Sequence, residues 1–238
     1  ADMVSWVALI GIVLPRMNVS EVLPLNQTVF PSFHAPEAVP ETIRKAMEAN
    51  VFVVVDKPRR WPFLGTEAYS GSGVILYKSP AGCIILTNRH VVDPYYVADD
   101  TGSVPRQAPI QVYFPDATSR EASVWWVDPL GADMALVATG RLPRDTQVPL
   151  NDSVPEMRIG DKVFAVGNPH ELSWSYAEGV ISGMREFPQG SQKLTIYQLQ
   201  VPINQGNSGG GLYAMDGTLI GIISWTKNKA QAEGIGFA

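Results

Sequence analysis

The most constraining feature of this sequence is a regular alternation of short apolar runs with turn residues. From residue 51 onward, runs rich in β-branched and aromatic residues recur, separated by Gly, Pro, Asn, Asp and Ser. The runs are residues 51–55, 73–77, 83–87, 111–114, 123–127, 134–138, 162–166, 177–182, 193–201, 210–214, 218–224 and 234–238. Segments of this length and composition are typical of β-strands, and the turn residues at 79–82 and 215–217 are typical of hairpins. The pattern therefore predicts an all-β protein built from barrels or sandwiches.

These runs form two sets of six, and the break between the sets falls at residues 140–155. This stretch holds three prolines and several polar residues, so it is predicted to be a linker. We therefore expect two six-stranded antiparallel β-barrels, the first over residues 41–145 and the second over residues 146–238. Together they would form one domain with its functional site in the cleft between the halves.

The first part of the chain differs from the rest. Residues 1–40 contain five prolines and show little periodicity, so they are predicted to form an extended arm without a core of its own. Residues 4–14 are apolar but fall short of the about 20 residues that a membrane-spanning helix needs. They are either the remnant of a signal or anchor segment or an arm packed on a neighbouring surface. A short helix is predicted over 41–49, because its apolar residues recur at helical spacing after Pro40.

Charge and cysteine content narrow the class of protein. The net charge is −5 over 238 residues and there is no long basic run, so nucleic acid is not expected as a partner. Cys83 is the one cysteine of the sequence, which excludes an internal disulfide. It lies in an apolar run and is predicted to be a buried small hydrophobe rather than a nucleophile.

The segment Gly206-Asn207-Ser208-Gly209-Gly210 carries the strongest catalytic signal. A serine hydroxyl is a weak nucleophile unless a base lies beside it and its backbone is held in a tight turn. Glycine neighbours permit such a turn, in which the amides of Gly206 and Ser208 can point together at a developing oxyanion. Taken alone, the segment fits an ordinary glycine-rich loop equally well.

Three histidines could supply the base. His34 lies in the N-terminal arm and His170 in a turn, and both are predicted to be exposed or capping residues. His90 follows the apolar run 83–87 and is expected at the end of a buried strand, where a rigid sheet presents a side chain to a cleft. A structural role is the alternative for this histidine.

The third member of such a system is a carboxylate that fixes the imidazole tautomer. Asp133 precedes the apolar run 134–138, so its carboxylate is expected at the mouth of a strand and partly shielded from water. Asp128 and Asp152 are rivals, but both lie beside turn-forming or polar residues and are predicted to be turn acids.

Read together, three blocks resemble the catalytic blocks of the HtrA (high-temperature-requirement) family of trypsin-like serine proteases. They are Thr-Asn-Arg-His-Val-Val at 87–92, Ala-Asp-Met-Ala-Leu-Val at 132–137 and Asn-Gln-Gly-Asn-Ser-Gly-Gly at 204–210. Two further blocks, at 160–169 and 217–222, are also similar to that family. Five matches in the correct order make the resemblance specific, and it implies a pair of chymotrypsin-like β-barrels.

The resemblance also implies a role for individual residues. It implies that His90 is the general base, that Asp133 orients it and that Ser208 is the nucleophile. It further implies an oxyanion hole made by the amides of Gly206 and Ser208, with Asn207 as the residue whose peptide orientation opens or closes that hole. We expect no metal and no organic cofactor, because side chains supply all of this chemistry.

The predicted substrate contacts depart from the family. Ser224-Trp225-Thr226 is more similar to the substrate-binding strand of digestive trypsin-like enzymes, in which the third position is often glycine. Thr226 is expected to narrow the mouth of the pocket. The other predicted contacts are Val201, Pro202 and Ile203, and they provide no carboxylate for a Lys or Arg side chain. We therefore predict cleavage after small or medium apolar residues.

The function implied is that of a serine endopeptidase acting through an acyl-enzyme on unfolded or exposed protein segments, as in protein quality control. The resemblance also implies a homotrimer and a periplasmic, secreted or organellar location. Membrane association is expected only through residues 4–14. Whether further domains follow residue 238 is left open.

Two hypotheses from other classes stay beside this one. The first is a catalytically latent chaperone or peptide-binding module on the same barrels, in which the oxyanion hole is collapsed. The second is an acyltransferase or esterase, which the sequence disfavours because it has no Gly-x-Ser-x-Gly elbow between a strand and a helix.

Overall fold

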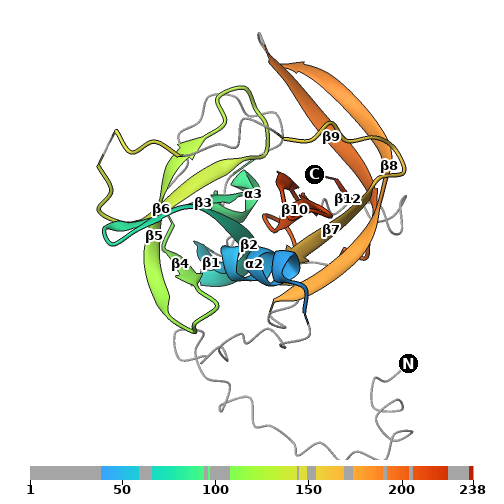
Figure 1. Cartoon of the computed structure of the whole chain (residues 1–238). Helices are drawn as coiled ribbons and strands as arrows, with labels where there is room; N and C mark the ends of the chain where they lie inside the picture. Colours follow the sequence, from blue (N-terminus) through green and yellow to red (C-terminus); the bar gives the residue numbers. More distant parts are fainter. Residues whose placement is uncertain are drawn as a thin grey trace, which may run out of the picture.

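The first half of the chain forms a closed β-barrel (Figure 1). The computed structural model describes residues 39–58, 66–93, 96, 108–143, 145–148, 154–168, 174–189, 192–203, 206–224 and 236–237. The barrel strands are β1 (Asn50–Pro58), β2 (Thr66–Ser79), β3 (Gly82–Thr87), β4 (Ile110–Tyr113), β5 (Ser119–Val127) and β6 (Ala135–Gly140). Their order is β1-β2-β3-β6-β5-β4, and antiparallel pairing of β1 with β4 closes the barrel.

The second half forms a six-stranded antiparallel sheet that curls beside the first barrel (Figure 1). Its strands are β7 (Lys162–Gly167), β8 (Ser175–Gln189), β9 (Gln192–Gln200), β10 (Gly211–Ala214), β11 (Leu219–Ile222) and β12 (Gly236–Phe237). The order is β11-β10-β7-β8-β9-β12. The predicted all-β class with two six-stranded halves is confirmed, and every apolar run predicted to be a strand overlaps one.

Each half has its own apolar core, which explains why these runs form strands. In the first barrel Val53, Ile85 and Val137 are fully buried in the core, whereas Phe52 and Val54, which alternate with Val53, form a separate buried cluster. In the second sheet Val163 and Leu212 occupy the same kind of position. Cys83 belongs to the first core, which confirms the prediction that it is a buried hydrophobe.

A single α-helix longer than one turn is described, and it covers the outside of the second sheet. Helix α2 (Glu41–Ala49) lies in the segment predicted to be helical and leads directly into β1 (Figure 1). Ala46 and Met47 on its apolar side pack against Phe164 and Trp174. No helix in the described part of the chain has the length and apolar character needed to cross a membrane. The predicted arm, apart from residues 39–40, lies outside the described residues.

The hairpin of β8 and β9 is longer than the sequence predicts. Pairing continues from Val180 opposite Gln200 to Gln189 opposite Gln192, although residues 184–188 of β8 are exposed. These residues do not alternate between apolar and polar, because neither face of the hairpin end is buried. The cross-strand hydrogen bonds, rather than a hydrophobic pattern, define the strand there.

Candidate active site

His90 lies just beyond the end of β3, in a helical turn. The turn, α3 (Arg89–Val92), begins after Asn88, so the prediction that His90 ends a strand is wrong in its local geometry. Val91 and Val92 point into the core of the first barrel, and this anchors the turn. The side chain of Arg89 is also buried, and its Nε lies 3.2 Å from Asp93 Oδ2. The result is a rigidly held turn that leaves the His90 ring about one-third exposed.

Asp133 lies directly against the His90 side chain. Its Oδ2 lies 2.6 Å from His90 Nδ1, and the backbone amide of His90 donates to Oδ1 at 2.9 Å. The side chain of Asn88 donates to the Asp133 carbonyl at 2.8 Å. Ser224 Oγ donates to Oδ2 at 3.2 Å. A carboxylate held in this way keeps the proton of the neutral ring on Nδ1 and gives Nε2 the lone pair that a general base uses.

The rival side chains do not share this geometry. Asp128 Oδ2 accepts hydrogen bonds from the backbone amides of Leu130 and Ala132, at 3.1 and 2.7 Å. It therefore closes the turn before β6, which confirms that it is a turn acid. Asp152, His34 and His170 lie outside the described residues.

Ser208 lies in a tight, buried turn that connects β9 to β10. Gly209 follows it with a φ of 85°, and Gly206 has a φ of 97°. A Cβ atom on Gly209 would lie 2.1 Å from the carbonyl oxygen of Ser72, so only glycine fits at that position. The turn is closed by a hydrogen bond from the amide of Gly210 to the Asn207 carbonyl at 2.8 Å.

The Ser208 turn and the His90 turn meet at Gly71 of β2. A Cβ atom added there would lie 2.8 Å from the side chain of Val91 and 3.1 Å from the carbonyl oxygen of Ser208. The backbone of Ser208 is thus in contact with the same glycine as the residue after His90. The structure therefore brings His90 into contact with Asp133 and places the backbone of Ser208 beside the turn that carries His90.

Asn207 is also buried, and the oxygen of its side chain makes no hydrogen bond. Asn207 Oδ1 is buried without a hydrogen bond, and it faces Gly167, where an added Cβ would lie 2.6 Å from it. Gly206 and Ser208 are buried on either side. Gln205, whose carbonyl shares a peptide with the Gly206 amide, lies outside the described residues.

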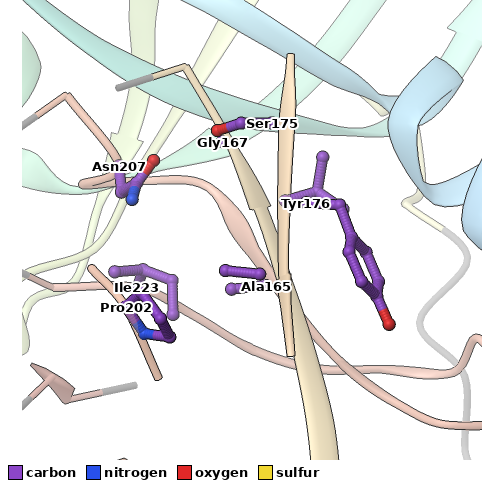
Figure 2. Close-up of a pocket in the computed structure, with 9 residues that line it drawn as sticks. Ala165, Gly167, Ser175, Tyr176, Pro202, Asn207 and Ile223 are labelled. Carbon is purple, nitrogen blue, oxygen red and sulfur yellow. The ribbon is translucent and has the colours of Figure 1, made fainter. Parts of the chain in front are cut away.

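A cavity of about 250 Å³ opens beside this turn (Figure 2). Pro202, Asn207 and Ile223 gather on one side of it, away from the ring of Tyr176. Ala165 lies between these two sides, and small residues form most of the rest. Among the described residues that line the cavity, none carries a charged side chain.

Only some of the predicted substrate contacts line the cavity. Pro202 lines the cavity, whereas Val201 is 2% exposed and packs in the core of the second sheet, with Ile203 against the same core. Ser224 directs its hydroxyl to Asp133. Trp225 and Thr226 lie outside the described residues.

Sequence reasoning missed several buried polar residues between the halves. Ser72, Thr87 and Asn168 are each at most 1% exposed, and hydrogen bonds connect them to one another and to the Ser208 turn. One signal was available, because Ser72 stands between two glycines within a strand. Glycines in a strand mark a close approach of another backbone.

Comparison with known proteins agrees with the fold. The family described as trypsin-like peptidase domain matches residues 71–222. The chain is 33% identical over 232 residues to the serine endoprotease DegS of Escherichia coli strain K12. This match covers 90% of this chain and 58% of DegS. The chain is also 32% identical over 180 residues to the serine protease Do-like HtrA of Bacillus subtilis strain 168, covering 73% of this chain and 37% of that protein.

A solved structure is similar as well. The HtrA-type protease AlgW with a tripeptide matches with a TM-score of 0.59 and 27% identity, over 82% of this chain and 57% of that one. The chain therefore spans between 37% and 58% of the length of these three proteins.

Proposed function

This chain belongs to the HtrA family of trypsin-like serine proteases, and we propose that it is an endopeptidase with Ser208 as nucleophile, His90 as base and Asp133 as orienting acid. The observation that carries the proposal is the 2.6 Å contact between His90 Nδ1 and Asp133 Oδ2, beside a buried turn that presents Ser208. This is the arrangement of charge and tautomer that activates a serine hydroxyl.

The chemistry follows from these groups. His90 Nε2 takes the Ser208 proton as Oγ attacks the peptide carbonyl, and Asp133 stabilises the imidazolium that forms. His90 then gives the proton to the leaving amine, which departs and leaves an ester on Ser208. Water, deprotonated by His90, attacks this acyl-enzyme, and Ser208 recovers its proton when the carboxylic acid product leaves.

The negative oxygen of each tetrahedral intermediate is proposed to lie against the amides of Gly206 and Ser208. In comparable sites one such donor lowers the barrier by about 3–4 kcal/mol, so its orientation is decisive. The peptide of Asn207 lies between these donors and is the part of the chain whose rotation would open or close the hole. Rotation of this peptide would break the hydrogen bond from the Gly210 amide to the Asn207 carbonyl, which favours discrete orientations over free rotation.

The central role of Ser208 is tested by Ser208→Ala. The variant is expected to lose nearly all hydrolysis of a denatured protein substrate while keeping the wild-type Tm, because it removes one buried oxygen and leaves the glycine-framed turn intact. Chromatographic peptide mapping of the digest measures the loss. Substantial hydrolysis by Ser208→Ala would refute the assignment, and a wild-type protein that binds this substrate without cutting it would favour the latent chaperone instead.

Cleavage is proposed to follow small or medium apolar residues. The cavity beside Ser208 is lined by Pro202, Ile223 and Ala165, and its described lining offers no carboxylate to a basic side chain. A buried, unpaired Lys or Arg would cost several kcal/mol. A peptide library that shows cleavage mainly after Lys or Arg would contradict this proposal.

Unfolded segments in an extracytoplasmic compartment are the proposed substrates. A relative from Salmonella typhimurium is named a periplasmic serine endoprotease, DegP, and is 33% identical over 153 residues. This name supports the compartment, and the preference for unfolded segments rests on the family resemblance. A substrate protein in its denatured form should be cut much faster than in its native form. Equal rates on both forms would contradict the preference for unfolded segments.

A homotrimer is the proposed assembly, on the strength of the family alone. Light scattering of the full chain measures the mass directly. A monomeric mass would remove this part of the proposal and leave the catalytic part untouched.

A further inference from the structure

We propose that Ser72, in β2 of the first barrel, is a positioning residue that holds the Ser208 turn of the second half in its catalytic geometry. This inference rests on the proposed endopeptidase function. It adds a residue that does not touch substrate but fixes the backbone on both sides of the nucleophile.

All hydrogen-bonding groups of Ser72 are used. Its amide donates to the Ser208 carbonyl at 2.7 Å, and its Oγ donates to the Gly206 carbonyl at 2.7 Å. Its Oγ also accepts from the amide of Asn168 at 2.9 Å, and its carbonyl accepts from Thr87 Oγ1 at 2.7 Å. The residue is fully buried, so water cannot substitute for any of these partners.

The hydroxyl of Ser72 has a defined direction. A serine hydroxyl has one proton to donate, and its oxygen accepts through its lone pairs. Because Asn168 occupies an acceptor position, the proton of Ser72 is directed to Gly206. Asn168 is itself held by a hydrogen bond from its Nδ2 to the Val51 carbonyl at 3.1 Å and is 1% exposed.

The two hydrogen bonds that Ser72 donates to the turn lie on either side of one peptide. The Gly206 carbonyl belongs to the peptide before Asn207, and the Ser208 carbonyl belongs to the peptide after Ser208. Between them lies the peptide that carries the Ser208 amide, one of the two proposed oxyanion donors. With both neighbours fixed by Ser72, this amide has little freedom to turn away, which is the preorganisation that electrostatic stabilisation requires.

The Ser208 turn packs closely against Ser72. A Cβ on Gly209 would lie 2.1 Å from the Ser72 carbonyl oxygen and 2.4 Å from Thr87 Oγ1. The turn therefore lies directly on Ser72 and Thr87, and Thr87 precedes the first residue of α3 by two positions and His90 by three. Through these contacts the nucleophile is positioned relative to the part of the first barrel that carries its base.

The test is Ser72→Ala, which removes the side-chain hydrogen bonds but keeps the bond from its amide to Ser208. We expect kcat on a fluorogenic peptide to fall by at least about tenfold, with KM changed less than about twofold, because the effect is on the transition state. Affinity for a peptide boronate, whose tetrahedral adduct occupies the oxyanion hole, should fall in parallel with kcat/KM.

The matched control is Thr139→Val. Thr139 is also fully buried, and its hydroxyl accepts from the Cys83 amide at 3.1 Å, at the end of β3 and β6 remote from His90. This variant should lower Tm to a similar degree and leave kcat within about twofold of wild type. If Ser72→Ala keeps wild-type kcat, or if Thr139→Val loses as much, the positioning role is wrong.

A second variant keeps the test decisive if Ser72→Ala does not fold. Thr87→Val is close to isosteric and removes the hydrogen bond to the Ser72 carbonyl, so kcat should fall several-fold at constant KM. An unchanged kcat in this variant would overturn the inference. Failure of the proposed function is a separate result, seen as a wild-type protein without turnover, whereas failure of positioning alone leaves wild-type turnover dependent on Ser208.

Discussion

At the scale of single residues, the environment of Asp133 decides what His90 can do. The carboxylate accepts from the ring, the backbone amide of His90 and the hydroxyl of Ser224, and the Asp133 carbonyl accepts from Asn88. These contacts come from both halves of the molecule, because Ser224 belongs to the second. The imidazole is therefore oriented by a partner that is itself held in place.

Asp133→Asn tests this orientation. An amide can donate to Nδ1 and stabilise the wrong tautomer, so kcat is expected to fall by about 10³–10⁴-fold with the fold intact. Asp128→Asn is the control, since Asp128 closes a turn by accepting two backbone amides, and its kcat should stay within about threefold. A kcat within tenfold of wild type for Asp133→Asn would mean that this carboxylate does not act on His90.

At the scale of elements, local patterns predicted the strands and the helix well. Alternating β-branched residues and glycine turns are local signals, and so is the spacing of apolar residues in α2. The turn α3 was not predicted, because Val91 and Val92 favour a strand when read locally. Its helical geometry is supported by the local i,i+4 pair of Arg89 and Asp93 and by a tertiary contact, the burial of Val92 in the barrel core.

The roles of buried polar residues were also not predicted from the sequence. The sequence places Asn50 at the end of a helix, a position it often takes as an ordinary cap. In the structure it joins three elements. Its Nδ2 donates to the Ala46 carbonyl and to Tyr213 Oη, at 2.6 and 2.8 Å, and its Oδ1 accepts from the Gly211 amide at 3.1 Å. Only the assembled fold brings Tyr213 and Gly211 to Asn50.

Asn50→Ala should therefore destabilise the protein strongly. It leaves buried groups on α2 and β10 without partners, and we expect the free energy of unfolding to fall by roughly 2–4 kcal/mol. Urea unfolding followed by tryptophan fluorescence measures the change. The exposed Ser182, which donates to the Gln198 carbonyl, is the control, and Ser182→Ala should stay within about 0.5 kcal/mol of wild type. A similarly small loss of unfolding free energy for Asn50→Ala would show that the side-chain hydrogen bonds of Asn50 are not important for stability.

At the scale of the whole molecule, α2 packs on a buried aromatic cluster of the second half of the chain. Phe164 stacks on Tyr213 with ring centroids 5.1 Å apart and lies 5.4 Å from Tyr176. Burial raises the pKa of Tyr213 well above its ordinary value of 10.0, with the hydrogen bond from Asn50 opposing part of this effect. Burial and the charge and hydrogen bond of Glu178 raise the pKa of Tyr176 to about 12.

These shifts predict a loss of stability in alkali. Below pH 10 both tyrosines are neutral in the folded and the unfolded chain, so the free energy of unfolding is at its full value. As the pH rises above 10, the unfolded chain ionises first and stability falls, by up to about 1.4 kcal/mol per pH unit for the buried Tyr213 and by less for Tyr176, whose hydroxyl is screened by solvent. Tyr213→Phe should flatten this fall between pH 10 and 12 in urea titrations. An identical slope in the variant would contradict the assignment of the shift to Tyr213.

The central claim is that folding brings Ser208, His90 and Asp133 together into one reactive site. The most direct measurement is labelling of the folded full chain with a fluorophosphonate, followed by mass spectrometry of the labelled peptide. The account predicts one label on Ser208, none in Ser208→Ala and labelling slowed by orders of magnitude in His90→Ala. A folded wild-type protein that takes up no label, or one labelled equally fast in His90→Ala, would contradict it.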